Sequence, residues 1–176
     1  INIITNKSDT SFGVFATFEG GSMATYQEAA GIHGIAGMLN FSLTGKRVDR
    51  DGIDDHDAYG ETSLAGGLGL DLPMGASLAA QFKYADAESD LNNSPGILNG
   101  VLVKDEDDED DSKTKTFFSS GLVLDQDVSE RFDYMVKIGY VDVERQFTFG
   151  PEGDEFGFGS ETTYAGNTLN AEAQAN

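Results

Sequence analysis

The chain has 176 residues, no cysteine, and a formal net charge of −20 from 31 acidic and 11 basic side chains. This balance argues against nucleic acid as a partner, because binding to phosphates depends on Lys and Arg. The absence of cysteine excludes disulfides and thiolate metal sites, and the sequence has no apolar run of about 18 residues that could form a transmembrane helix.

Apolar and polar residues alternate along most of the chain, which predicts strands rather than helices. The alternation is clearest at 131–143, where Phe132, Tyr134 and Tyr140 share a face with Val136 and Ile138. The predicted strands lie, in chain order, at 11–20, 25–33, 38–46, 62–71, 75–86, 116–125, 131–143 and 167–176. The stretch at 25–33 has the weakest pattern and is assigned because its neighbours are strands. Most of these strands have the length of membrane-spanning strands, about 9–11 residues, rather than the ~5–6 of soluble ones.

The connections between the predicted strands alternate in length. The short ones are 31–37, 71–75 and 125–130, and the long ones are 45–60, 86–115 and 146–161; the connection at 19–24 is the exception on the long side. Antiparallel strands place alternate connections at opposite rims, and outer-membrane barrels have one short and one long rim. The run of seven carboxylates from Asp105 to Asp111 lies on the long rim. We interpret it as a solvated loop, with a divalent-cation site as the alternative.

The first residues, "INIITNK" at 1–7, do not fit the strand series. They resemble the segment that closes the plug domain of TonB-dependent outer-membrane receptors. The stretches that follow also resemble this family, in its cobalamin and siderophore branch: "SFGVFATFEGGSMATYQEAAG" its first hairpin, "FSLTGKRVDRDGID" its third strand and loop, "YADAESDLNN" the end of its fifth strand, and "NTLNAEAQAN" its eighth strand.

The resemblance implies an all-β fold, an antiparallel up-and-down transmembrane β-barrel that is partial here. Residues 1–8 would be the last strand of the plug, and residues 9–176 would be about eight strands of a 22-stranded barrel. A small closed eight-stranded barrel is the main structural alternative. We expect a fragment instead, because the chain ends in "AEAQAN" without the terminal aromatic residue of small barrels.

The function implied by the resemblance is that of a receptor in the bacterial outer membrane. It would take up a scarce nutrient, such as a siderophore, another metal chelate or cobalamin, energised through TonB. Its partners would be outer-membrane lipid, the nutrient, and the TonB system through a plug and box that this chain lacks. The alternatives are a passive or structural small barrel and a soluble acidic calcium-binding β-protein. The sequence lacks a nucleophile elbow, a cysteine nucleophile, a zinc motif and a phosphate loop, so we expect no enzymatic activity.

Two groups of residues are candidate sites. Oxygen ligands suit Ca²⁺, and the first group is an acidic loop made of Asp49, Asp51, Asp54, Asp55 and Asp57. Its "DRDG" stretch resembles the calcium-binding loop of cobalamin receptors, although it is not an EF-hand; an exposed acidic loop without an ion is the alternative. The second group consists of aromatic residues in one predicted loop: Phe147, Phe149, Phe156 and Phe158. They would capture the ligand, or alternatively only pack their own loop.

Overall fold

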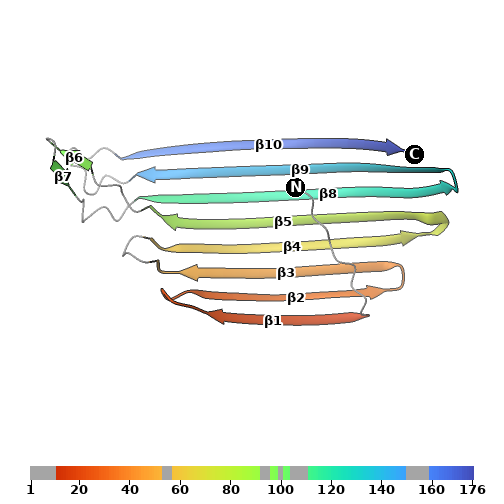
Figure 1. The fold of residues 1–176 in the computed structure, drawn as a ribbon, viewed down its shortest axis with the longest axis horizontal. Coiled ribbons are helices and arrows are strands. Elements are labelled where there is room, and N and C mark those ends of the chain that lie inside the picture. The colour runs from red at the N-terminus through yellow and green to blue at the C-terminus, as the bar shows by residue number, and fades with distance from the viewer. Residues whose placement is uncertain (1–10, 53–56, 92–95, 99–100, 104–110, 150–158) are drawn as a thin grey trace.

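The chain forms one open antiparallel sheet in a computed structural model that describes residues 11–52, 57–91, 96–98, 101–103, 111–149 and 159–176. Eight strands follow one another in the up-and-down order β1-β2-β3-β4-β5-β8-β9-β10 (Figure 1). They are β1 Phe12–Gly20, β2 Tyr26–Ala36, β3 Leu39–Arg50, β4 Tyr59–Leu72, β5 Ala76–Asp90, β8 Ser112–Ser129, β9 Phe132–Phe149 and β10 Ser160–Ala175. The first and last strands do not pair with each other, so the sheet is not closed.

The all-β fold and the eight up-and-down strands predicted from the alternation are confirmed, including the weakly patterned strand that became β2. The predicted plug strand at 1–8 lies outside the described residues. Among the described residues, no helix is long and apolar enough to cross a membrane. The one helical element in this described part of the chain is a single 3-10 turn, η1 Pro73–Gly75, in the connection between β4 and β5.

The strand ends that the sequence predicted on the side of the long connections were wrong. Strand β8 begins at Ser112 rather than 116, β9 continues to Phe149 rather than 143, and β3 continues to Arg50 rather than 46. Most of the added residues are polar on both faces, with Val48, Phe147 and Phe149 as exceptions, so the alternation of hydrophobicity is lost although the backbone pairing continues.

The connections are correspondingly shorter than predicted. The stretch 31–37 is mostly strand, and the turn after β2 is Gly37–Met38, where Gly37 adopts φ 65°. Only glycine adopts that conformation without strain. The connection from β5 to β8 holds an unpredicted pair of short strands, β6 Gly96–Leu98 and β7 Val101–Val103.

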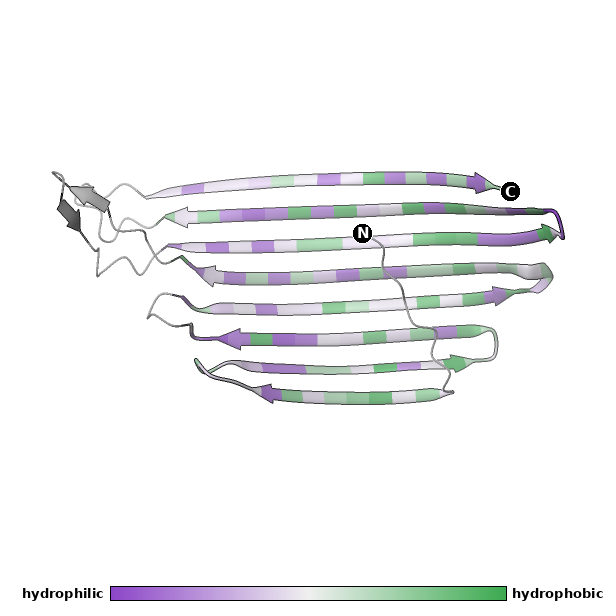
Figure 2. Cartoon of the chain, in the orientation of Figure 1, coloured by the Kyte–Doolittle hydropathy of each residue, from purple (hydrophilic) through white to green (hydrophobic). Residues whose placement is uncertain are grey.

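The sheet has one apolar and one polar face. Side chains alternate across a strand, and directly paired residues share a face. Pairs such as Phe41–Leu68, Leu78–Leu124 and Leu122–Ile138 therefore join into a continuous apolar band across the strands. Figure 2 shows the hydrophobic residues gathered in the half of the strands near the short turns, while the other half is mainly hydrophilic.

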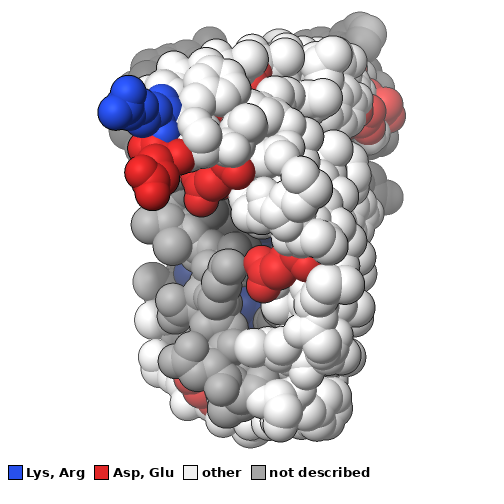
Figure 3. Space-filling model, turned by 90° about the vertical axis from the view of Figure 1, so that its right-hand side faces the viewer, with Lys and Arg blue, Asp and Glu red and all other residues white. Residues whose placement is uncertain are grey.

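The apolar face is convex and the polar face is concave. Figure 3 looks along the strands and shows the sheet curved around a hollow in which Lys and Arg side chains lie. On the outer side this view shows some Asp and Glu but no Lys or Arg. Lys83, which lies between the band residues Phe82 and Tyr84, belongs by alternation to the concave face.

Aromatic side chains mark the edges of the apolar band. Toward the long connections, Phe118 is paired with Tyr84 and its ring centroid lies 6.3 Å from that of Tyr140. Toward the short turns, the centroids of Phe132 and Tyr134 lie 6.4 Å apart. An apolar band between two aromatic girdles is the pattern of outer-membrane barrels.

The band has no cover within the described structure. None of the described hydrophobic residues is buried, and Leu68 and Leu169 are 56% and 71% exposed. A face of this size needs another surface or a lipid phase against it, because exposed apolar patches of several hundred Å² are rare on soluble monomers.

The strands are also staggered. Followed through the pairings, Phe12 at the start of β1 aligns with Ile138, yet β9 begins six residues earlier at Phe132. Six residues are roughly 20 Å along a strand, and six strand-to-strand steps are roughly 29 Å, so the short turns follow a line tilted by roughly 35°. Barrel strands tilt by about 35–45° from the barrel axis.

Gly66 in the band provides a test of the packing. A Cβ added there would lie 2.6 Å from Cε1 of Phe82 and 3.1 Å from the carbonyl oxygen of Ser42. We expect Gly66→Ala to lower the free energy of unfolding by about 1–3 kcal/mol, measured by urea unfolding in phospholipid vesicles. Gly45→Ala is the matched control, because a Cβ at Gly45 would meet only Leu64, at 4.0 Å. Equal urea midpoints for the two variants would contradict this packing.

Candidate ligand-binding surface

Basic side chains gather on the concave face beyond the apolar band. Nine Lys and Arg residues lie in the described part of the chain, and the pairing places seven of them on this face. The seventh, Lys137, lies nearer the short turns, and its Nζ is 4.0 Å from a carboxylate oxygen of Glu172. We call the other six the basic surface: Lys46, Arg50, Lys83, Lys113, Lys115 and Arg145.

A pocket of about 240 Å³ lies within the basic surface, over β4, β5 and β8. Small side chains of β5 form its floor, since every second position from Ala85 is small: Ala85, Ala87 and Ser89. The remaining lining residues are Lys83, Lys113, Lys115, Glu61, Glu88, Tyr59 and Phe117. Because the floor is small, long basic side chains surround an accessible space rather than a packed interior.

Aromatic rings accompany the cations. The Lys113 Nζ lies 5.7 Å from the Phe147 ring centroid, the Lys115 Nζ 5.9 Å from that of Phe117, and the Arg50 Cζ 5.9 Å from that of Tyr59. These distances fall within the range of cation–π attraction. The surface therefore offers both positive charge and flat apolar area.

The positive charges are not neutralised within the sheet. Lys115 lies directly opposite Arg145, and like charges at directly opposed positions destabilise a sheet. Among the described residues, neither of these two forms an ion pair, and neither do Lys46, Lys83 and Lys113. Glu61 accepts a 2.5 Å hydrogen bond from the Tyr59 hydroxyl instead of pairing with a lysine.

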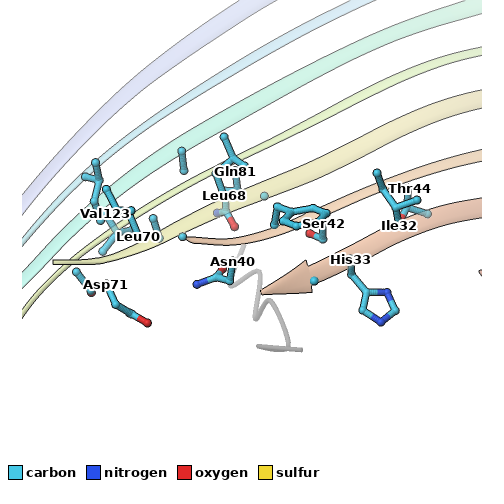
Figure 4. Close-up of a pocket in the computed structure, with 18 of the residues that line it drawn as sticks. Ile32, His33, Asn40, Ser42, Thr44, Leu68, Leu70, Asp71, Gln81 and Val123 are labelled. Carbon is cyan, nitrogen blue, oxygen red and sulfur yellow. The ribbon is translucent and has the colours of Figure 1, made fainter. Parts of the chain in front are cut away.

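The concave face is different nearer the short turns. A second pocket of about 560 Å³ is lined there by small and uncharged polar side chains, including Asn40, Ser42 and Gln81, together with apolar ones such as Phe41 and Leu70. Figure 4 shows Asn40, Asp71 and His33 on the same side of the ribbons. The basic surface thus begins with Lys83, level with the edge of the apolar band, and extends from there toward the long connections.

The predicted acidic site is only partly within the described residues. Asp49 is at the end of β3 on the convex face, and its carboxylate receives two hydrogen bonds from Arg47, at 2.7 and 2.8 Å. The hydrogen bond from Arg47 holds the pKa of Asp49 below its usual value. Asp57 lies 4.0 Å from Arg50. The described residues contain no group of three His, Cys, Asp or Glu that could hold a metal ion. Asp54 and Asp55 lie outside them, so calcium binding by this loop, including Asp51, stays a prediction.

Two of the four predicted aromatic residues are placed by the structure. Phe147 and Phe149 have the concave orientation on β9, and Phe147 meets Tyr164 edge to face at a centroid distance of 6.0 Å. Phe147 also contacts Lys113, which connects the predicted aromatic group to the basic surface. Phe156 and Phe158 lie outside the described residues.

Sequence reasoning missed the basic surface because the cations are dispersed over four strands. A signal was nevertheless present, because each of these basic residues lies on the face opposite to the apolar band. Lys83 lies between Phe82 and Tyr84, and Lys115 shares the parity of Phe117 but not of Phe118. Only the register brings these positions together.

No protein-family model matches the chain, and no match to it is found among curated proteins.

Tyr59 allows a spectroscopic test of the pocket. The hydrogen bond to Glu61, together with partial burial, raises the pKa of Tyr59 to about 12 from an ordinary value of 10.0. We expect an absorbance titration of wild type minus Tyr59→Phe to show that Tyr59 is no more than about one-tenth ionised at pH 11, where an ordinary tyrosine is mostly ionised. Glu61→Gln removes the negative acceptor, so Tyr59 should then ionise closer to pH 10. An unchanged titration in Glu61→Gln would contradict the hydrogen bond as the cause.

Proposed function

We propose that the chain is part of a receptor in the bacterial outer membrane that takes up a scarce nutrient, with energy supplied through TonB. The observation that carries the proposal is the apolar band on the convex face, which has aromatic edges and no cover among the described residues. Lipid covers such a band in outer-membrane barrels. The resemblance of the "INIITNK" segment and of the stretches after it supports the choice of receptor family.

The open sheet favours a larger barrel over a small closed one. Eight strands in a closed barrel leave an interior just wide enough for side chains. Here β1 and β10 are unpaired with each other, and the six cations of the basic surface would have to share that interior. Desolvation of unpaired charges is costly, so a wide, hydrated lumen suits this face better.

A soluble calcium-binding β-protein would need a second layer over the apolar face. In a β-sandwich the inner faces of two sheets cover each other. The described strands belong to a single main sheet, and the only other sheet is the three-residue pair β6–β7.

Adjacent alanines on β5 test whether lipid covers the convex face. Ala80 is in the middle of the apolar band, and its neighbour Ala79 belongs by alternation to the concave face. We expect Ala80→Arg to lower the free energy of unfolding in phospholipid vesicles by about 2–4 kcal/mol, because an arginine would enter the bilayer. Ala79→Arg should have a much smaller effect. If the two variants lose stability equally, lipid does not cover this face.

Single cysteines test the location and the orientation, because the chain has no cysteine of its own. Ser22 lies in the β1–β2 connection on the long side, and Val128, 54% exposed, lies at the short-turn end of β8. In intact cells we expect a membrane-impermeant maleimide to label Ser22→Cys, but to label Val128→Cys only after the outer membrane is permeabilised. Labelling of both in intact cells would contradict the proposed orientation. Nutrient uptake that persists after a protonophore treatment would contradict energy coupling.

A further inference from the structure

We propose that the basic surface is a binding site for a small solute that carries two or more oxyanion groups, such as carboxylates or phosphates. This inference rests on the proposed function, because the concave face is the wall of a lumen only if the sheet belongs to a barrel. It adds the charge class of the ligand, which the resemblance leaves open.

The first support is the separation of charge between the two faces beyond the band. The concave strand positions carry the six cations of the basic surface against Glu19 and Glu61. The convex positions carry eight carboxylates against Arg47 alone: Glu28, Asp49, Asp86, Glu88, Asp90, Asp142, Glu144 and Glu161. A protein with a net charge of −20 thus has a positive surface on one side of its sheet.

The second support is that the nearest carboxylates do not neutralise the pocket. Glu61 lines it from the concave face together with Lys83, Lys113 and Lys115; Glu88 also borders it, but from a strand position whose side chain alternates to the convex face. Glu61 accepts the hydrogen bond from Tyr59, and within the described residues neither glutamate forms an ion pair with these lysines. Three ammonium groups around one pocket therefore keep donors for an external acceptor.

The third support is the opposed pair of Lys115 and Arg145. Their repulsion would be relieved by an oxyanion bound between them, which would accept charge-assisted hydrogen bonds from both. Lys113 is two residues from Lys115 on the same strand, roughly 7 Å away along the backbone. Cations at this spacing suit a ligand with separate oxyanion groups better than a single halide ion.

The surroundings fit the body of such a ligand. The floor of Ala85, Ala87 and Ser89 leaves space above the sheet, and Tyr59 and Phe117 provide flat walls. An anion in contact with this floor would lie on the face away from the carboxylates of the convex side.

Citrate is a suitable probe, with triethyl citrate as an uncharged analogue of the same skeleton. We expect isothermal titration calorimetry of the full-length protein in a neutral detergent to show citrate binding and no binding of triethyl citrate. The variant Lys113→Gln/Lys115→Gln should bind citrate at least about tenfold more weakly, since hydrogen bonds to two charged groups are lost.

The matched control is Arg47→Gln/Lys137→Gln, which removes the same total charge. Arg47 is on the convex face, and Lys137 lies near Glu172 below the basic surface. We expect this control to bind citrate as tightly as wild type. Equal citrate affinities for both double variants, equal binding of the ester, or no binding of either citrate or inorganic pyrophosphate to wild type would overturn the proposal. Urea midpoints of the two double variants in detergent show whether each is folded.

The outcome is separable from that of the proposed function. Loss of citrate affinity in Lys113→Gln/Lys115→Gln combined with failed surface labelling would leave the anion site standing and remove the outer-membrane receptor. If the cysteines are labelled as expected but the two double variants bind citrate equally, the outer-membrane receptor stands and the anion site is removed.

Discussion

The structure depends on an amphipathic sheet whose apolar side has no partner in the described part of the chain. Hydrogen bonds between neighbouring strands satisfy the backbone of the inner strands, but they do not remove the band of Leu, Phe, Val and Ile from water. Burial of such side chains is the dominant favourable term in folding, so this sheet gains most of its stability only when something else covers the band. The other features are arranged around this band. The short turns lie just past one of its edges, and past the other edge the paired strands continue with mainly charged and polar side chains.

The sequence was sufficient to predict the strands wherever one face is apolar. Phe132 to Tyr140 and Ala76 to Tyr84 alternate clearly, and both stretches form strands with the expected faces. The prediction stopped where the apolar face stopped. At Glu144, Arg145 and Gln146 both faces are polar, and the strand continues because the backbone remains paired with β8 and β10. Local composition carries no information about that pairing, which depends on neighbours far away in the chain.

Dependence on distant strand pairing also explains why the sequence predicted only part of the candidate site. Phe147 was predicted as a ligand residue from the aromatic composition of its loop, whereas Lys83 and Lys113 were not, since each is one cation in a different strand. The register brings Lys113 and Phe147 together and sets Lys115 against Arg145. Asp49 was grouped with Asp57 because they are close in sequence. The alternation of β3 turns Asp49 to the convex face, where Arg47 binds it.

The separation of charge between the faces has a consequence for salt. The Debye length is about 30 Å at 0.01 M ionic strength and about 8 Å at 0.15 M. In dilute buffer an approaching anion responds to the whole molecule and is repelled by its net charge of −20. In saline the carboxylates of the convex side are screened, and the anion responds only to the cations beside it. Moderate salt therefore removes the distant repulsion before it weakens the local attraction, so association with the concave face is fastest at an intermediate ionic strength rather than at the lowest one.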